Sequence, residues 1–233
     1  MKSIVRQIGI FVMTLFLMSE VVAKEVSDYQ VWTPININYK VNDKVRAFLE
    51  LQPRVGNDGS HLKTGIIRPA IGYAITPEIT LWAGYLMQAS DNRYGNPDNY
   101  DIENRIWQGL TYKTTFNKQF IFEVRNRLEE RFLDHNPNEQ TRWRTRFRGE
   151  YLIDQTPLSV IASEEIFVNL HNNGYNKSIQ EGFDQNRSYI GVGYRFAPEF
   201  QVETGYLKQY VGGYAGKANQ NNDVWMTNFN VNF

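Results

Sequence analysis

Arginines at alternate positions are the residues of this chain best suited to bind another molecule. Arg142, Arg144, Arg146 and Arg148 are each separated by a single residue. A guanidinium group is planar and permanently charged, and it binds carboxylate or phosphate through two parallel hydrogen bonds. The spacing therefore predicts an anion-binding surface wherever these side chains share one face. The residues predicted to line it are Arg105, Arg125, Arg127, Arg131, Arg142, Arg144, Arg146, Arg148 and Arg187.

Glutamates interleave with these arginines and offer them partners. The expected ion-pair partners are Glu103, Glu123, Glu129, Glu150 and Glu165. The same face is expected to carry further bases and two further acids: Arg46, Arg54, Arg68, Lys113, Arg195, Glu50 and Glu203. Basic groups then outnumber acids by about two to one, so that face should be electropositive although the whole chain is neutral.

Other kinds of chemistry find little support in the sequence. The three histidines, His61, His135 and His171, fall in expected loops, and His171 lies eight residues beyond Ser163. Acidic residues of the loops match no metal-binding spacing. Cysteine is absent, which excludes a thiol catalyst and a lipid-modified cysteine. We predict no catalytic residue, no metal site and no cofactor. Lys plus Arg and Asp plus Glu both number 25, so nucleic acid is not an expected partner.

The elements that must position the arginines are β-strands. Trp143, Phe147 and Tyr151 alternate with the arginine row, a period of two that separates apolar from charged side chains on a strand and scatters them on a helix. The same pattern recurs along the chain. It predicts strands at residues 31–41, 44–55, 62–75, 79–88, 102–113, 119–133, 141–153, 158–170, 183–196, 200–210 and 224–233.

The connections between these strands are alternately short and long. Short ones are expected at 42–43, 76–78, 114–118, 154–157 and 197–199, and long ones at 56–61, 89–101, 134–140, 171–182 and 211–223. Barrels of the bacterial outer membrane have short periplasmic turns and longer extracellular loops. The pattern predicts an all-β fold, a transmembrane antiparallel up-and-down β-barrel of about twelve strands, with ten to twelve allowed.

Aromatic residues on the apolar face indicate that this face meets lipid. They gather beside the short turns (Tyr73, Tyr112, Phe120, Tyr151, Tyr194, Phe196 and Phe200) and beside the long loops (Tyr85, Phe132, Trp143, Tyr206, Tyr210 and Trp225). Trp143 and Tyr151 lie eight strand steps apart, or about 20 Å along the membrane normal at a tilt of roughly 40°, close to the apolar band of about 25 Å. A soluble barrel would place its apolar side chains inside.

The two ends of the chain carry export signals. Residues 1–23 have a basic start, an apolar run and a small-residue cleavage pattern before Lys24, and we interpret them as a signal peptide. Residues 24–233 are expected to form a single barrel domain. The terminal alternation of Trp225, Phe229, Val231 and Phe233 resembles the strand that the outer-membrane barrel assembly machinery recognises.

Two features fit this picture poorly. Glu130 and Glu164 fall on the predicted lipid face, unless a β-bulge changes the register near Glu164. The eleven expected strands are an odd number, whereas single-chain bacterial barrels have even numbers. Either residues 24–30 begin a twelfth strand, or residues 31–41 lie elsewhere and ten strands remain.

Several sequence blocks resemble one bacterial family. The blocks are Trp32, Gln52-Pro-Arg54, Arg68-Pro-Ala-Ile-Gly-Tyr73, Leu81-Trp-Ala-Gly-Tyr85, Glu103-Asn-Arg-Ile-Trp-Gln108, Arg127-Leu-Glu-Glu-Arg131, Trp143-Arg-Thr-Arg146 and Phe183-Asp-Gln-Asn-Arg187. Together they resemble the family called domain of unknown function 2490, over nearly the whole chain after the signal peptide. The resemblance implies an outer-membrane barrel of unassigned role, and it assigns no catalytic or ligand residue.

Three functions remain open. The first is a narrow pore or binding channel for small anions or acidic saccharides. The second is a structural barrel whose lumen is closed by salt bridges, since ten to twelve strands lie between filled and open barrels. The third is a lipid-modifying enzyme, for which the sequence offers least. In each case we expect a monomer in the bacterial outer membrane, with lipid, lipopolysaccharide and the assembly machinery as partners.

Overall fold

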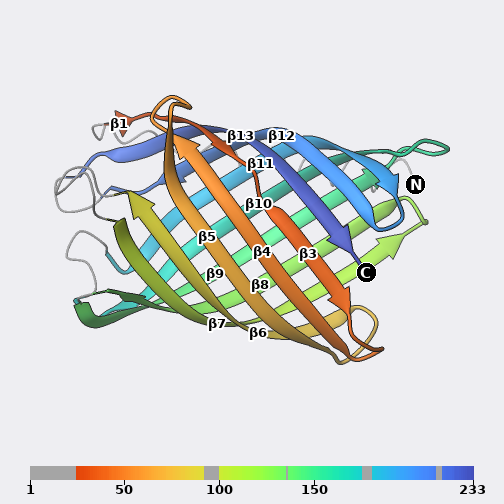
Figure 1. The fold of residues 1–233 in the computed structure, drawn as a ribbon, viewed down its shortest axis with the longest axis horizontal. Helices are drawn as coiled ribbons and strands as arrows, with labels where there is room; N and C mark the ends of the chain where they lie inside the picture. The colour runs from red at the N-terminus through yellow and green to blue at the C-terminus, as the bar shows by residue number, and fades with distance from the viewer. Residues whose placement is uncertain (1–24, 92–99, 135, 175–179, 214–216) are drawn as a thin grey trace.

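The protein is a closed β-barrel (Figure 1). The computed structural model describes residues 25–91, 100–134, 136–174, 180–213 and 217–233, so the expected signal peptide lies outside the described residues. Thirteen strands join in one sheet. Within these ranges there is no helix long and apolar enough to cross a membrane.

Ten long strands form most of the wall, and each pairs antiparallel with the next along the chain. They are β4 (Val45–Gly56), β5 (His61–Ala74), β6 (Ile79–Asp91), β7 (Tyr100–Phe116), β8 (Phe120–Leu133), β9 (Asn136–Leu152), β10 (Leu158–Asn172), β11 (Gly182–Ala197), β12 (Phe200–Val211) and β13 (Asn219–Asn232).

Three N-terminal pieces close the barrel. They are β1 (Glu25–Val26), β2 (Tyr29–Trp32) and β3 (Ile35–Lys40), and all three run parallel to β13 at successive heights. On their other side β2 and β3 pair antiparallel with β4. The thirteen strands therefore occupy eleven positions around the barrel, because β1, β2 and β3 share one position.

Eleven strand positions fall within the expected ten to twelve, but the number is odd where an even one was expected. In an up-and-down barrel with eleven strand positions, the first and the last strand run in the same direction. The pair that closes the barrel must therefore be parallel, as it is between β13 and β3. Glu25–Val26 and the start of β2 do contribute strand, but at the same position around the barrel as β3. The sequence pattern gave the period of each strand and not the direction of the closing pair.

The strands extend past their expected bounds at the long-loop end. β6 ends at Asp91, β9 begins at Asn136 and β13 begins at Asn219, so parts of the expected loops 89–101, 134–140 and 211–223 are strand. These segments are polar on both faces, which is why they resembled loops. Their backbone groups are nevertheless paired, as Asn221 is with Tyr210.

Candidate functional site: the lumen

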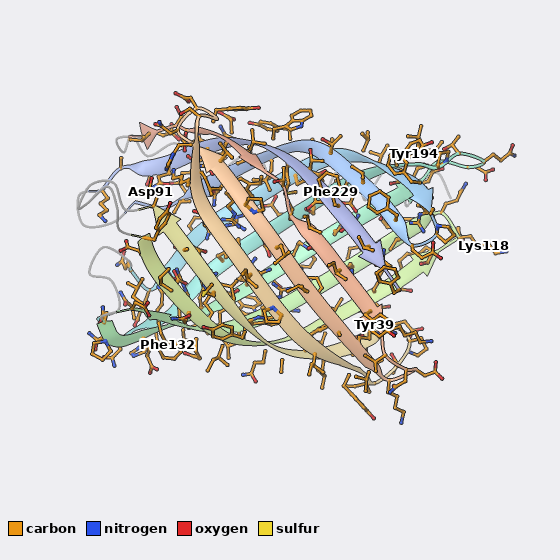
Figure 2. All side chains as sticks on the ribbon, viewed as in Figure 1. Tyr39, Asp91, Lys118, Phe132, Tyr194 and Phe229 are labelled. Carbon is orange, nitrogen blue, oxygen red and sulfur yellow. The ribbon has the colours of Figure 1, made fainter. Side chains whose placement is uncertain are left out.

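The barrel carries its apolar side chains outside and its charges inside (Figure 2). Ile71 on the outer face is 67% exposed, whereas Glu129 on the inner face is 1% exposed. Tyr39 and Tyr194 lie at the short-turn end in Figure 2, and Phe132 lies at the opposite, long-loop end. The alternation along each strand places the predicted lining arginines and their glutamate partners on the inward face, and Arg195 continues that face at the short-turn end, where it is exposed.

Glu129 of β8 is the centre of a buried ion-pair cluster. Its carboxylate accepts bonds from Arg142 Nη2 at 2.7 Å and from Arg144 Nη1 at 2.6 Å, and Arg105 Nη1 lies at 3.5 Å. The strand register explains the first contact, because Glu129 lies directly opposite Arg142 of β9. One carboxylate thus compensates several guanidinium groups.

Glu165 of β10 joins the same cluster from the next strand. Arg144 Nη2 donates to it at 2.9 Å, Arg125 Nη2 at 3.3 Å, and Arg187 Nη1 lies at 3.7 Å. Arg144 therefore bridges Glu129 and Glu165. The chain of contacts runs along the inner wall over four neighbouring strands, from β8 to β11.

Further ion pairs extend this cluster toward both ends of the barrel, and we name the whole set the ion-pair ladder. Arg131 donates two bonds to Glu103, Arg146 pairs with Glu123, and Arg148 reaches both Glu150 at 2.9 Å and Glu203 at 2.7 Å. Arg68 donates to Glu50 at 2.6 Å on the opposite wall. The ladder narrows the lumen with ion pairs.

Two inward arginines are held by aromatic rings and have no carboxylate within salt-bridge distance among the described residues. The guanidinium carbon of Arg54 lies 3.9 Å from the centre of the Trp32 ring, and that of Arg127 lies 4.3 Å from the centre of Trp107. Such contacts stabilise a cation by roughly 0.5–2 kcal/mol without neutralising it. The carboxylate of Glu50 attracts both cations from beyond the distance of a direct ion pair.

The lumen contains a larger and a smaller cavity, and four arginines line both of them. The larger has a volume of about 350 Å³ and lies at the long-loop end, where Gly212, Gly213 and Lys217 contribute to its wall. The smaller, of about 110 Å³, lies toward the short-turn end. The shared residues, Arg54, Arg68, Arg144 and Arg187, form a layer between the cavities that we name the arginine layer.

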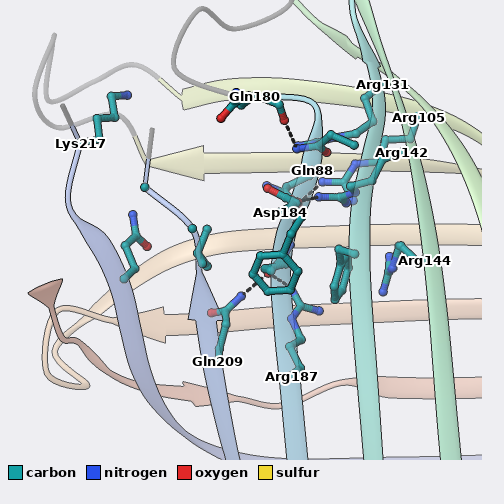
Figure 3. A pocket seen from close by; sticks show the side chains of 18 of the residues that line it. Gln88, Arg105, Arg131, Arg142, Arg144, Gln180, Asp184, Arg187, Gln209 and Lys217 are labelled. Carbon is teal, nitrogen blue, oxygen red and sulfur yellow. Dashed lines mark hydrogen bonds and ion pairs between the residues drawn. The ribbon is translucent and has the colours of Figure 1, made fainter. Parts of the chain in front are cut away.

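Figure 3 shows the loop-end cavity from close by. Arg105, Arg131 and Arg142 lie together on one side with Gln88 and Asp184, and Arg187 and Gln209 lie on another. Asp184 is paired, because Arg142 Nη1 donates to it at 3.0 Å. Seven arginines in all contribute to the lining: Arg54, Arg68, Arg105, Arg131, Arg142, Arg144 and Arg187.

Sequence reasoning missed the uncharged part of the lumen. One inward apolar cluster comprises Trp32, Ile161, Tyr189, Leu207 and Val224, and a second comprises Ile66, Ala70, Leu86 and Trp107. Phe167 was missed as well, although it lies between Glu165 and Asn169 on the same inward face of β10. The period of two could have placed these residues inside. They were not named because the sequence interpretation considered only charged residues for the lumen.

The outward glutamates are partly satisfied in place. Thr141 Oγ1 donates to Glu130 at 2.8 Å, and Asn186 Nδ2 donates to Glu164. The suggested bulge at Glu164 does not occur, because the irregularities of β10 lie at Phe167/Val168 and Asn169/His171. Both glutamates face outward among neutral polar partners.

Two of the histidines lie beside carboxylate groups. His61 Nε2 lies 2.5 Å from Asp91 Oδ2, and His171 Nδ1 lies 3.4 Å from Glu181 Oε1. His135 falls outside the described residues. No group of three potential metal ligands occurs in the parts of the chain that the structure covers.

These features define a class: a closed barrel with an apolar exterior and an arginine-rich, ion-paired interior. The chain belongs to the family described as "Protein of unknown function (DUF2490)", whose model matches residues 29–221. An uncharacterized protein of Methylorubrum extorquens is 31% identical over 189 residues, which are 80% of each chain. Among solved structures, a chain described as outer-membrane expressed OmpT of Vibrio cholerae is similar at a TM-score of 0.42 and 16% identity. That match covers 78% of this chain and 61% of the other, so this protein spans about three fifths of its length.

Proposed function

We propose that this protein is a monomeric barrel of the bacterial outer membrane whose loop-end cavity binds small anions and passes them toward the arginine layer. The observation that carries the proposal is the set of unused donors around the cavity. The Nε atoms of Arg54, Arg68, Arg144 and Arg187 are buried and have no hydrogen-bond partner among the described residues. A buried N–H without a partner costs about 1–3 kcal/mol, which an anion in the cavity would offset.

The exterior supports membrane placement. Large apolar side chains such as Ile106 and Ile190 are each 62% exposed, while the charges are enclosed. Water disfavours that arrangement and hydrocarbon favours it, because lipid accepts only apolar groups and a closed sheet pairs its backbone. The C-terminal residues suit assembly in that membrane, since Trp225, Phe229 and Val231 share the outward face of β13 and Phe233 is 65% exposed.

The charge balance supports anions over cations. Inward basic groups outnumber inward acids about two to one, and confinement by a low-dielectric wall concentrates the resulting field. Rings of arginine select anions in other pores for this reason. The long-loop end is the expected external face, so the larger cavity would meet solutes first.

A closed structural barrel is the second candidate, and the ion-pair ladder favours it. Glu129 and Glu165 link inward side chains of the neighbouring strands β8, β9, β10 and β11, and two apolar clusters fill more of the lumen. In that case the cavities would hold only water. We propose a binding or conducting role over an enzymatic one, because seven arginines line the loop-end cavity.

Planar-bilayer recording of the purified protein tests the proposal. We expect steady small currents with a reversal potential that favours anions in a potassium chloride gradient. Arg54→Gln should shift that potential toward zero, because Arg54 lines both cavities and its charge is not paired. Arg46→Gln is the matched control, since Arg46 is inward but lines neither cavity.

The outcomes separate the candidates. Absence of any steady channel, together with no binding of anions by calorimetry, would overturn the proposal in favour of the closed barrel. A conducting protein whose reversal potential is the same in the wild type and in Arg54→Gln would show that the arginine layer does not select the permeant ion.

A further inference from the structure

The loop-end cavity offers a buried acceptor as well as buried donors. Asn169 lies on the inward face of β10, is 2% exposed and lines this cavity. Its Oδ1 atom is buried and has no hydrogen-bond partner among the described residues. Chloride and ionised carboxylate groups have no proton to donate, so neither of them can satisfy this atom.

The orientation of the Asn169 amide is fixed by its other bond. The Nδ2 atom donates to the backbone carbonyl of Gln180 at 3.0 Å, a dashed contact in Figure 3. A carbonyl oxygen can only accept, so the amide cannot be reversed without losing that bond. The free atom is therefore the oxygen, and it requires a donor from a ligand or from water.

Neutral polar groups continue from Asn169 around the cavity. Gln209 Nε2 donates to Gln185 Oε1 at 2.8 Å, and Arg187 Nη2 lies 3.4 Å from the same oxygen. Gln88 Oε1 accepts from Arg105 Nη2 at 2.9 Å. Amides of this kind both donate and accept, which matches hydroxyl groups better than it matches a bare ion.

An aromatic ring supports three of the arginines at the base of the cavity. The guanidinium carbons of Arg142, Arg144 and Arg187 lie 5.1, 4.5 and 4.7 Å from the centre of Phe167. The ring holds the charged groups in place and leaves the Nε donors of Arg144 and Arg187 unused. The volume of about 350 Å³ is at the lower end of small-molecule sites, which are roughly 300–1,000 Å³.

From these four observations we infer that the loop-end cavity selects a hydroxylated organic acid, of the chemical class of a sugar acid. The inference rests on the proposed anion binding and adds its specificity. The carboxylate would accept from the unpaired arginine Nε donors, and a hydroxyl group would donate to Asn169 Oδ1. A simple carboxylate leaves Asn169 Oδ1 without a donor, and a neutral sugar meets the arginine donors with uncharged hydroxyl groups in place of a carboxylate.

Calorimetric titration of the detergent-solubilised full barrel with four probes tests this inference. Galacturonate carries both groups, hexanoate and acetate carry only the carboxylate, and galactose carries only hydroxyls. We expect galacturonate to bind about tenfold more tightly than each of the others, since one hydrogen bond of about 1.4 kcal/mol is a factor of ten. This comparison requires no variant and so does not depend on how a mutant folds.

Substitution of Asn169 gives the second readout. Asn169→Leu has a similar shape and removes the acceptor, so galacturonate affinity should fall roughly five- to tenfold while hexanoate affinity stays unchanged. Asn228→Leu makes the same change in the smaller cavity, which Asn169 does not line, and should leave both affinities unchanged.

Equal binding of galacturonate and hexanoate to the wild type would overturn the inference and leave anion binding intact. Loss of galacturonate and hexanoate affinity together in Asn169→Leu would also overturn it. Failure of every acid to bind would overturn both the inference and the proposed function.

Discussion

Arg54 and Arg187 both lie against the ring of Trp32, with their guanidinium carbons 3.9 and 5.0 Å from its centre. The three residues come from β4, β11 and β2, so one indole ring holds together two cations of distant strands. Trp32 Nε1 donates to Gln30 Oε1 at 2.9 Å, and this bond orients the ring on β2. The strand β2, which helps to close the barrel, thus positions two of the four arginines of the arginine layer.

Replacement of Trp32 should therefore weaken the anion preference. Cation–π contacts of roughly 0.5–2 kcal/mol hold each guanidinium, so Trp32→Leu should let both arginines move and reduce the anion-to-cation permeability ratio by about two- to tenfold. Trp107→Leu removes an equivalent ring beneath Arg127, which lines neither cavity, and should leave the ratio unchanged. An equal loss in both variants would indicate a general effect of destabilisation.

Glu129 should be the carboxylate that contributes most to the stability of the barrel. Its replacement by glutamine leaves the guanidinium groups of Arg142 and Arg144 buried without their shared counter-charge. Breaking a buried ion pair on one side costs about 3–5 kcal/mol, so Glu129→Gln should lower the urea midpoint of unfolding in lipid vesicles substantially. Glu78→Gln, at an exposed turn, is the control. Similar midpoints for the two variants would contradict the central role of Glu129.

Gly84 should not tolerate a methyl group. A Cβ atom there would lie 2.5 Å from the Trp107 ring and 2.7 Å from the Pro69 carbonyl oxygen, whereas one at Gly65 would meet nothing within 4 Å. Overpacking costs typically about 1–3 kcal/mol, so Gly84→Ala should unfold at lower urea concentration than Gly65→Ala. An unchanged midpoint for Gly84→Ala would show that the indole ring of Trp107 can move aside.

Asp28 should contribute stability that depends on pH. It lies between β1 and β2, and it accepts from Lys63 Nζ of β5 at 2.9 Å and from the Asp58 backbone N–H of the β4–β5 connection at 3.1 Å. Burial acts to raise the pKa of Asp28, but these bonds and the Lys63 charge hold the pKa below 3.8. A carboxyl group whose pKa is lowered by folding stabilises the fold above the unfolded pKa, and this contribution is lost as the pH falls through the folded value.

We therefore expect Asp28→Asn to destabilise the barrel by roughly 0.5–1 kcal/mol at neutral pH, the scale of an exposed pair. The difference from wild type should shrink below pH 3.8. Thermal unfolding of both proteins in the same detergent between pH 7 and pH 3 measures it, with Asp154→Asn as a turn control. A difference that grows on acidification would contradict the assigned contacts.

Much of the fold follows from the period of two. Residues 141–153 already separate Trp143 and Phe147 from Arg144 and Arg146, and the structure has β9 in that register. The parallel pairing that closes the barrel does not follow, because nothing in the sequence of β3 indicates that its neighbour is β13. The break at Thr33 and Pro34 between β2 and β3 also passed unnoticed within one expected strand.

The site was less predictable than the fold. Alternation places Arg54 and Arg187 on the inward side, but it cannot show that they meet at Trp32, since their strands are far apart in the sequence. Asn169 was overlooked because an isolated asparagine near a strand end resembles many others. Its role depends on the contact with Gln180, which only the three-dimensional arrangement reveals.

The reactivity of single cysteines tests the central claim most directly, because the natural chain contains none. Gln209→Cys lies in the loop-end cavity and Ile190→Cys on the apolar exterior. In lipid vesicles, with rates normalised to a free thiol, the cavity cysteine should react about tenfold faster with a sulfonate-bearing methanethiosulfonate than with its trimethylammonium counterpart. The exterior cysteine should react with neither reagent. A cavity cysteine that prefers the cationic reagent, or an exterior cysteine that reacts as readily, would contradict an apolar outer face around an electropositive lumen.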